Sequence, residues 1–329
     1  MTVLVTGGAG YIGSHTVIEL IDLGYDVLTV DNFQKGHKQA LLGSKFVQAD
    51  LRDIDRVDEI FKKNNIEAVI HFAADSLVGE SMQNPNKYFI NNVISGLNIL
   101  TVMLKYKVDK IIFSSTAAVY GEPQQIPIQE NNLTVPTNPY GESKLIFEKM
   151  LFWYEKAYNL KYISLRYFNA SGAHKSGKIG EHHNPETHLI PIVLECALGK
   201  RDCVEIYGDD YKTFDGTCIR DYIHVSDLAM AHILALKKLY QKDSKSAIYN
   251  LGNGSGFSVK QIIKVSEEVT GRKIKTIPAK RRSGDPAVLI ASSDKIKKEL
   301  DWQPKYEDIY TIISTAWAWH KSHPDGFKE

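Results

Sequence analysis

The segment VLVTGGAGYIGSH near the start of the chain constrains the fold more than any other part of the sequence. Gly7, Gly10 and Gly13 have the spacing G-x-x-G-x-x-G between an apolar run typical of a strand and an amphipathic run, residues 11–24, typical of a helix. Glycines let the backbone turn tightly and approach a pyrophosphate, and the N–H groups that begin the helix then face the anion. The pattern predicts a dinucleotide-binding turn; a glycine-rich turn without a ligand is the alternative.

The carboxylate that follows this turn indicates which dinucleotide is bound. Asp31 ends the predicted second strand, 18 residues after Gly13. A carboxylate at this place accepts hydrogen bonds from the adenosine ribose hydroxyls and repels a 2′-phosphate. The expected cofactor is therefore NAD rather than NADP.

Short β-branched runs alternate with longer amphipathic stretches through the first half of the chain. Continuous apolar strands separated by helices are typical of a parallel sheet that is covered on both faces. The predicted fold is α/β: a doubly wound parallel Rossmann sheet with a smaller, interleaved α/β substrate domain. The first domain is expected over residues 1–169, with segments of about 220–252 returning to it, and the second over 170–329. Strands are expected at 3–7, 26–31, 45–50, 67–73, 110–116, 162–168 and 247–252, and helices at 11–24, 56–65, 86–107 and 139–158.

The second half of the sequence is less regular. Residues 169–191 and 207–225 are polar, without clear periodicity, and are expected to form long binding loops. Helices are expected at 190–200 and at 226–240, the latter capped by Ser226. The tail from about Val259 is expected to hold two further helices.

The overall composition excludes several classes of partner. The 329 residues include 40 basic and 39 acidic side chains, so there is no electrostatic reason to expect nucleic acid or an anionic membrane as a partner. There is no basic leader before the first apolar run, and no apolar run has the length of a membrane span. Cys196, Cys203 and Cys218 are odd in number and lack a Cys-x-x-Cys spacing, which indicates free thiols and a cytoplasmic location.

Two tyrosine–lysine pairs have the four-residue spacing that places both side chains on one helix face. Tyr106 and Lys110 bracket the amino end of the predicted fifth strand. Tyr140 and Lys144, in PYGESK, begin a helix that follows the carboxyl end of the same strand. Ligands bind at the carboxyl ends of parallel strands, so we expect the second pair to be the chemical one. Other side chains expected at these strand ends are Asp50, Leu51, Phe72, Ala73, Ala74, Ser114, Ser115 and Thr116.

A lysine ammonium beside a tyrosine favours the phenolate and lowers its pKa from about 10 toward neutrality. Tyr140 is therefore a candidate general base, with Thr116 or Ser115 forming a hydrogen bond to the same substrate hydroxyl. The alternative is a half-buried tyrosine that only packs.

The combination of the glycine fingerprint, HFAA, FSSTAAVYG, Tyr140-x-x-x-Lys144 and LRYFNASGAH resembles the extended short-chain dehydrogenase/reductase family. GTCIRDYIHVSDLA and YNLGNGSGFSV resemble, more narrowly, the UDP-sugar 4-epimerases of that family, and the resemblance covers nearly the whole chain. It implies interconversion of UDP-glucose and UDP-galactose by transient oxidation at sugar C4 with bound NAD. It also implies a homodimer formed by the helices that carry ISGLNIL and LIFEKMLFWY.

The resemblance also assigns residues. Tyr140 is implied as the base at the sugar 4-hydroxyl, Lys144 as the holder of the nicotinamide ribose, and Thr116 as the hydroxyl residue after the paired serines. The positions that match NAD contacts are Tyr11, Ile12, Asp31, Asn32, Asp50, Leu51, Phe72, Ala73, Asn91 and Phe168. Those that match nucleotide-diphosphate contacts are Asn169, His188, Leu189, Tyr207, Arg220, Arg282 and Asp285. Arginine suits a diphosphate because it offers permanent charge and planar donors; surface ion pairs are the alternative for Arg220 and Arg282.

The chain departs from the family pattern at two positions, and a third position bears on substrate choice. Ser76 stands where many members have lysine, which leaves a nicotinamide contact open, and His188 stands where asparagine is common. Leu289 matches the residue beside the sugar N-acetyl pocket, so acceptance of N-acetylated sugars is open.

Three other functions compete with this prediction. A nucleotide-sugar 4,6-dehydratase needs an added acid and base, but Ala117 and Ala118 stand where those enzymes carry carboxylates. A 4-epimerase of another UDP-sugar, such as an N-acetylhexosamine, uronate or pentose form, is harder to exclude, and a non-catalytic NAD-binding regulator is possible on this fold.

The histidine-rich segment EHHNPETH lacks a helical His-x-x-x-His spacing, so a solvated loop rather than a metal site is expected there.

Overall fold

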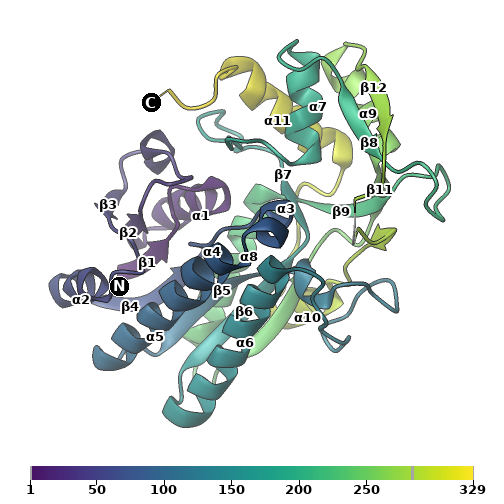
Figure 1. Ribbon diagram of the computed structural model, residues 1–329. Helices are drawn as coiled ribbons and strands as arrows, with labels where there is room; N and C mark the ends of the chain where they lie inside the picture. Colours follow the sequence, from purple (N-terminus) through teal and green to yellow (C-terminus); the bar gives the residue numbers. More distant parts are fainter. Residues whose placement is uncertain (1, 283–284, 329) are drawn as a thin grey trace. The chain divides into compact units, whose positions relative to one another are not determined.

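The computed structural model describes residues 2–282 and 285–328, which form two compact units (Figure 1). The chain passes between the units several times. The first unit comprises Met1–Gly121, Leu133–Arg166 and Ala229–Tyr249, and the second comprises Glu122–Asn132, Tyr167–Leu228 and Asn250–Glu329.

A seven-stranded sheet forms the centre of the first unit, in the order β10-β6-β5-β4-β1-β2-β3. The pairings of β1 with β2 and β4, of β2 with β3 and of β4 with β5 are parallel. The strand order reverses between β1 and β4, and in such sheets that point opens the ligand crevice at the carboxyl edge. The strands are β1 (Thr2–Thr6), β2 (Asp26–Asp31), β3 (Lys45–Gln48), β4 (Ile66–His71), β5 (Lys110–Thr116), β6 (Lys161–Tyr167) and β10 (Ala247–Leu251).

Helices connect these strands and cover the sheet. α5 and α6 run side by side (Figure 1), and Gly96 of α5 lies so close to the Phe147 ring of α6 that a Cβ there would be 2.4 Å from it. α2 packs on α5. The helical segments are α1 (Tyr11–Asp22), η1 (Lys38–Leu41), α2 (Ile54–Lys63), α3 (Val78–Gln83), α4 (Pro85–Tyr88), η2 (Phe89–Ile94), α5 (Ser95–Lys105), η3 (Ala117–Tyr120), α6 (Pro139–Tyr158) and α8 (Val225–Leu239).

Two expectations for the helices need correction. The single helix expected over 86–107 is divided into α4, the π-helical turn η2 and α5. The three segments are consecutive, so the change of helix type is not visible in the sequence periodicity. Ser226 does not cap α8, because the helix already begins at Val225. The N–H of Ser226 donates to Nδ1 of His224 at 3.1 Å.

The apolar core of the first unit explains why the strands are continuous runs of Val, Ile and Leu. Leu4, Val69, Ile99, Ile111 and Leu151 are all at most 1% exposed and belong to one cluster between the sheet and its helices. Burial of each such side chain stabilises the fold by about 1.5–3 kcal/mol. The polar residues that follow each strand are left at the sheet edge.

The second unit combines short strands with three helices that share an apolar core, in which Ile190, Val193, Ile262, Ile312 and Ile313 are buried. One sheet has the order β11-β9-β13 with β7 also paired to β9, and β12 pairs with β8. The elements are β7 (Asn169–Ser171), α7 (Leu189–Ala197), β8 (Val204–Tyr207), β9 (Ile219–His224), β11 (Gly256–Ser258), α9 (Val259–Thr270), β12 (Thr276–Ala279), β13 (Val288–Leu289), α10 (Asp294–Leu300) and α11 (Ile309–Ser322).

The second unit is more ordered than the sequence suggested. The stretch 207–225, expected to be a loop, contains β9, which pairs with β7, β11 and β13. These strands are short and carry polar residues, so they lack the apolar run that identifies a strand in sequence. The described tail holds three helices, α9, α10 and α11, rather than two.

Two further observations concern the whole described chain. Across residues 2–282 and 285–328, no helix combines the length and the apolar character needed to cross a membrane. Cys196, Cys203 and Cys218 are free thiols, as the sequence predicted.

Candidate active site

The glycine-rich turn between β1 and α1 has a shape that side chains would fill. Gly7 has a φ of +69°, and a Cβ on it would lie 2.6 Å from the backbone nitrogen of Ala73. A Cβ on Gly13 would lie 2.2 Å from the carbonyl oxygen of Gly7. Gly10 caps α1 without any side-chain hydrogen bond, so the helix N-terminus keeps its positive end for an anion. These residues fit the pyrophosphate of a dinucleotide.

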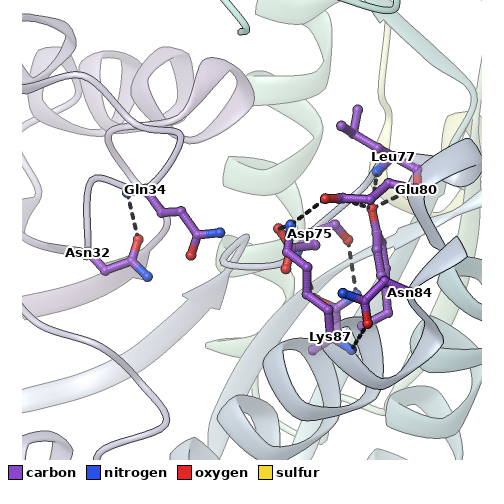
Figure 2. A network of polar contacts seen from close by, with 9 residues as sticks. Asn32, Gln34, Asp75, Leu77, Glu80, Asn84 and Lys87 are labelled. Carbon is purple, nitrogen blue, oxygen red and sulfur yellow. Dashed lines mark hydrogen bonds and ion pairs between the residues drawn. The ribbon is translucent and has the colours of Figure 1, made fainter. Parts of the chain in front are cut away.

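Asp31, at the end of β2, is held where a ribose would be recognised. Its carboxylate accepts hydrogen bonds from the N–H groups of Ala9 at 3.0 Å and Phe33 at 2.8 Å. Burial raises the pKa of Asp31, while the two backbone donors oppose that shift. Asn32, the next residue, accepts from the N–H of Gln34 at 2.9 Å (Figure 2).

Other predicted cofactor residues lie at the ends of the next strands. The N–H groups of Phe72 and Ala73 both donate to the carbonyl of Thr6, at 3.0 and 3.2 Å, which ties the end of β4 to β1. The Leu51 carbonyl accepts from Asn98 at 2.9 Å. Asp50 forms an ion pair with Arg52, and this hydrogen bond lowers the pKa of Asp50. Tyr11 and Ile12 form the first turn of α1, Ala74 follows Ala73, Ser114 lies on β5, and Asn91 lies in η2.

The start of α6 is fixed tightly against the end of β5. Asn138 caps the helix by accepting from the N–H of Gly141 at 2.9 Å. A Cβ on Gly141 would lie 2.6 Å from the carbonyl of Ala118, so only glycine permits this approach. The close packing positions Tyr140, whose side chain is hydrogen-bonded to Thr116 and whose ring contacts Tyr88 edge-on at 6.4 Å.

Lys144 lies one turn further along α6 and is 3% exposed. Its Nζ donates to the carbonyl of Ser114 at 2.8 Å. Burial lowers the pKa of Lys144 to about 7, and the nearby carboxylate of Glu148 opposes the shift.

The expected effect of Lys144 on Tyr140 is not found. Burial raises the pKa of Tyr140, and the hydrogen bond with Thr116 opposes that rise. The prediction assumed a fully charged ammonium next to the phenol, whereas the Lys144 ammonium is directed at a backbone carbonyl and is itself partly neutralised by burial.

Ser115 is engaged differently from the prediction. Its hydroxyl donates to Oε1 of Glu148 at 2.5 Å, and the same carboxylate accepts from Nε of Arg166 at 2.9 Å. Arg166 also donates to the hydroxyl of Tyr120 at 2.9 Å. Thr116 is thus the β5 hydroxyl that contacts Tyr140. The buried Glu148–Arg166 pair was missed, although Glu148 follows Lys144 by four residues on the same face of α6.

The second tyrosine–lysine pair has separate partners. The Tyr106 hydroxyl donates to Asp58 at 3.3 Å, and Lys110 forms an ion pair with Asp109 at 2.6 Å. Tyr106 is the C-cap residue that follows α5, and Lys110 begins β5, at the amino end of that strand. This pair is half-buried, Tyr106 packs against the apolar core, and neither side chain lies at the carboxyl end of the sheet.

A polar network follows β4, next to the position where Ser76 replaces the family lysine. Figure 2 shows Asp75, Glu80 and Lys87 converging, with Nζ of Lys87 2.7 Å from Glu80 and 3.5 Å from Asp75. The Tyr88 hydroxyl donates to Glu80 at 2.9 Å. α4 therefore places Lys87 close to Asp75, the residue before Ser76.

The predicted nucleotide-diphosphate residues lie in the second unit, and four of them form two pairs. Arg220 on β9 forms an ion pair with Asp285 at 3.3 Å. The Arg282 guanidinium stacks over the Tyr207 ring at 3.9 Å. Both arginines keep donors for an anion, because each has five N–H groups.

The remaining predicted residues of the second unit are also placed. Asn169 begins β7 and donates to the carbonyl of Asp221 at 2.9 Å. His188 is the N-cap residue of α7 and Leu189 its first residue. Leu289 ends β13. Phe168 is predicted to contact NAD; its N–H donates to the carbonyl of Leu251 at 3.1 Å.

The first unit has the strand order, the glycine turn and the terminal aspartate of a dinucleotide-binding α/β protein, and it adds a tyrosine–lysine pair at the sheet edge. Comparison with known proteins agrees: the model of the NAD dependent epimerase/dehydratase family matches residues 3–252. The chain belongs to this family.

Individual relatives are similar over the whole chain. The UDP-glucose 4-epimerase of Halalkalibacterium halodurans is 58% identical over 327 residues, which cover 99% of this chain and 98% of that protein. A crystal structure of a UDP-glucose 4-epimerase matches with a TM-score of 0.97 at 55% identity, covering 100% of both chains. The UDP-glucose 4-epimerase from Bifidobacterium longum, in complex with NAD+ and UDP, matches with a TM-score of 0.95 at 42% identity, covering 99% of this chain and 100% of that one.

Proposed function

We propose that this protein is an NAD-dependent isomerase that interconverts UDP-glucose and UDP-galactose by transient oxidation at sugar C4. The observation that carries the proposal is the position of Tyr140 beside Thr116 at the carboxyl end of β5, with Lys144 one turn beyond on α6 and its Nζ 2.8 Å from the carbonyl of Ser114. The glycine turn and Asp31 supply the cofactor site.

The residues divide the chemistry between them. NAD held by these residues would supply the acceptor and donor of the hydride at sugar C4. Tyr140 removes the proton from the 4-hydroxyl and gives it back to the epimeric oxygen. Thr116 holds the hydroxyl of Tyr140 and favours its ionised form, since its hydrogen bond opposes the rise in the pKa of Tyr140.

Lys144 and the nucleotide residues have positioning roles in this proposal. Lys144 donates to the Ser114 carbonyl and holds the nicotinamide ribose with its remaining N–H groups. Arg220 and Arg282 bind the diphosphate through charge-assisted hydrogen bonds. Firm binding of the UDP part with few contacts to the sugar would let the 4-keto sugar rotate, so that its other face meets the cofactor before hydride returns.

The segment after Thr116 argues against elimination of water. Ala117 and Ala118 begin η3, and the N–H of Ala118 donates to the Thr116 hydroxyl at 3.1 Å. Neither side chain has a group that transfers a proton, whereas a dehydratase needs an acid and a base there. Oxidation at C4 is then followed by reduction at the same carbon.

The proposed assembly is a cytoplasmic homodimer. Ile94, Leu97, Phe152 and Trp153, from the end of η2 and from α5 and α6, are 41–65% exposed. α5 and α6 lie side by side, and large exposed apolar side chains on adjacent helices are typical of a surface that a second copy covers. Two helices from each copy would form a four-helix contact.

The experiment that tests the function is a product analysis of the purified protein with UDP-glucose, UDP-N-acetylglucosamine, UDP-glucuronate and UDP-xylose. The proposal predicts formation of UDP-galactose from UDP-glucose with no accumulation of reduced nicotinamide. Turnover of another UDP-sugar alone would assign a different 4-epimerase, and a lack of turnover with all four would contradict an epimerase.

A further inference from the structure

Four potential metal ligands converge in the loop that precedes α7. Glu181, His183, Glu186 and His188 each offer one nitrogen or oxygen, and these four atoms all lie within 4.8 Å of one another. Sequence analysis expected a solvated loop here. Instead, the side chains of Glu181 and Glu186 are only 5% and 4% exposed, because the loop folds back so that both carboxylates face the two imidazoles.

Three of the nitrogen–oxygen distances within this cluster are close to those of a tetrahedral cation site, and the fourth contact, between His188 and Glu181, is a direct hydrogen bond that a bound ion would replace. Two ligands bound to one zinc ion at about 2.0–2.1 Å lie about 3.3 Å from each other in a tetrahedron. Nδ1 of His183 lies 3.3 Å from Oε1 of Glu181 and 3.6 Å from Oε2 of Glu186. Nδ1 of His188 lies 3.7 Å from Oε1 of Glu186 and also contacts Glu181.

The negative charge of the cluster is not balanced by the basic side chains nearby. Two buried carboxylates need compensating positive charge. Lys200 and Arg201 line the same cavity, which has a volume of about 450 Å³. Lys200, however, forms an ion pair with Asp325 at 2.6 Å, and Arg201 pairs with Glu195 at 3.1 Å. Positive charge must therefore come from the histidines or from a bound cation.

A buried histidine on a neighbouring helix points independently to a ligand. His320 of α11 lines the same cavity and is 8% exposed. Its Nε2 is buried and has no hydrogen-bond partner within the part of the chain that the structure describes. His320 belongs to α11, which lies outside the loop and packs beside α7 (Figure 1). A buried imidazole nitrogen without a partner is costly unless a cation or a water bound to it completes the site.

We propose that Glu181, His183, Glu186 and His188 bind one Zn²⁺ ion, with His188 ligating through Nδ1 so that its Nε2 stays available for the nucleotide contact that the family resemblance implies. Two imidazole nitrogens and two carboxylate oxygens in a tetrahedral arrangement suit zinc, because Ca²⁺ and Mg²⁺ take six or more oxygen ligands. His320 completes the surroundings of the ion from α11. The ion has a structural role: it fixes the loop 181–188 at the start of α7. The competing arrangement is a metal-free cluster in which protonated histidines neutralise the carboxylates.

The test loads the purified protein with Zn²⁺, removes loosely bound metal by gel filtration and measures the retained zinc. A parallel sample receives Co²⁺, whose visible spectrum reports tetrahedral coordination. The matched variants are His183→Gln and His182→Gln, because His182 belongs to the same loop but accepts from the N–H of Phe327 at 3.2 Å instead of joining the cluster.

The expected result is about one zinc ion per wild-type chain, an intense cobalt spectrum and a higher thermal midpoint with Zn²⁺. His182→Gln should keep all three properties, and His183→Gln should lose them. The proposal is overturned if the wild-type protein retains no zinc, if cobalt gives only the weak spectrum of octahedral ions, or if folded His183→Gln binds zinc as the wild type does. The wild-type spectrum decides the question even if a variant fails to fold, and none of these readouts depends on the epimerase activity.

Discussion

Arg166 and Glu148 form a buried ion pair inside the first unit, in which Nε of Arg166 donates to Oε1 of Glu148 at 2.9 Å and both side chains are 4% exposed. The pair joins β6 to α6, and Glu148 lies one turn after Lys144. Ser115 donates to the same carboxylate. The arrangement links the strand that carries Thr116 to the helix that carries Tyr140.

Glu148→Gln should destabilise the protein by about 3–5 kcal/mol, because it leaves the Arg166 charge buried without its partner. It should also lower the pKa of Lys144 further, since the carboxylate is what opposes the effect of burial. Urea unfolding measures the loss of stability. Glu59→Gln, which removes an exposed ion pair with Arg56, is the control and should cost less than about 1 kcal/mol. Equal effects of the two substitutions would show that the buried pair has no special role.

Tyr140→Phe should reduce kcat by about 10²–10⁴-fold while leaving UDP binding unchanged, because it removes a proton-transfer group without altering the ring. Initial rates with UDP-glucose and calorimetric titration with UDP measure the two quantities. Tyr106→Phe is the matched control, since Tyr106 has the same spacing to a lysine but bonds to Asp58. A loss of kcat in the control as large as that of Tyr140→Phe would contradict the assignment.

Lys144→Met should raise the free energy of unfolding near pH 7. It should also remove part of the pH dependence of that free energy. The pKa of Lys144 is about 7 in the native state against 10.5 in the unfolded state, so the unfolded state binds more protons between these values. Native stability therefore rises with pH from about 7 to 10.5, and below pH 7 the lysine costs up to roughly 5 kcal/mol. Urea unfolding at pH 7 and pH 9 measures this slope. An unchanged slope in Lys144→Met would mean that the lysine is not responsible.

Arg220→Ala should raise KM for UDP-glucose by about 10–100-fold, as expected from the loss of a charge-assisted hydrogen bond to a phosphate, with a small change in kcat. Steady-state kinetics separate the two constants. Arg201→Ala, which removes an arginine paired with Glu195, is the control and should leave KM unchanged. An unchanged KM in Arg220→Ala would remove this residue from the nucleotide site.

Sequence reasoning predicted the first unit well because its signals are local. The glycine turn, Asp31 and the continuous strands follow from backbone geometry and from burial on both sheet faces. The strands β2 and β5 and the helix α6 have the expected bounds. The interruption of 86–107 by η2 was missed because a π turn leaves the apolar pattern nearly unchanged.

The second unit and the electrostatics of the site depend on contacts between distant residues. β9 is recognisable only through its partners β7, β11 and β13. The depressed pKa of Lys144 arises from burial, which the spacing of Tyr140 and Lys144 does not reveal. The convergence of Glu181 with His188 depends in the same way on how one loop folds.

The most direct test of the central claim uses UDP-glucose that carries deuterium at sugar C4. If hydride leaves C4 and returns to the other face of the same carbon, UDP-galactose formed in ordinary water should keep the label at C4, with no net formation of reduced nicotinamide. Loss of the label to solvent, or a dehydrated sugar as the product, would contradict the account.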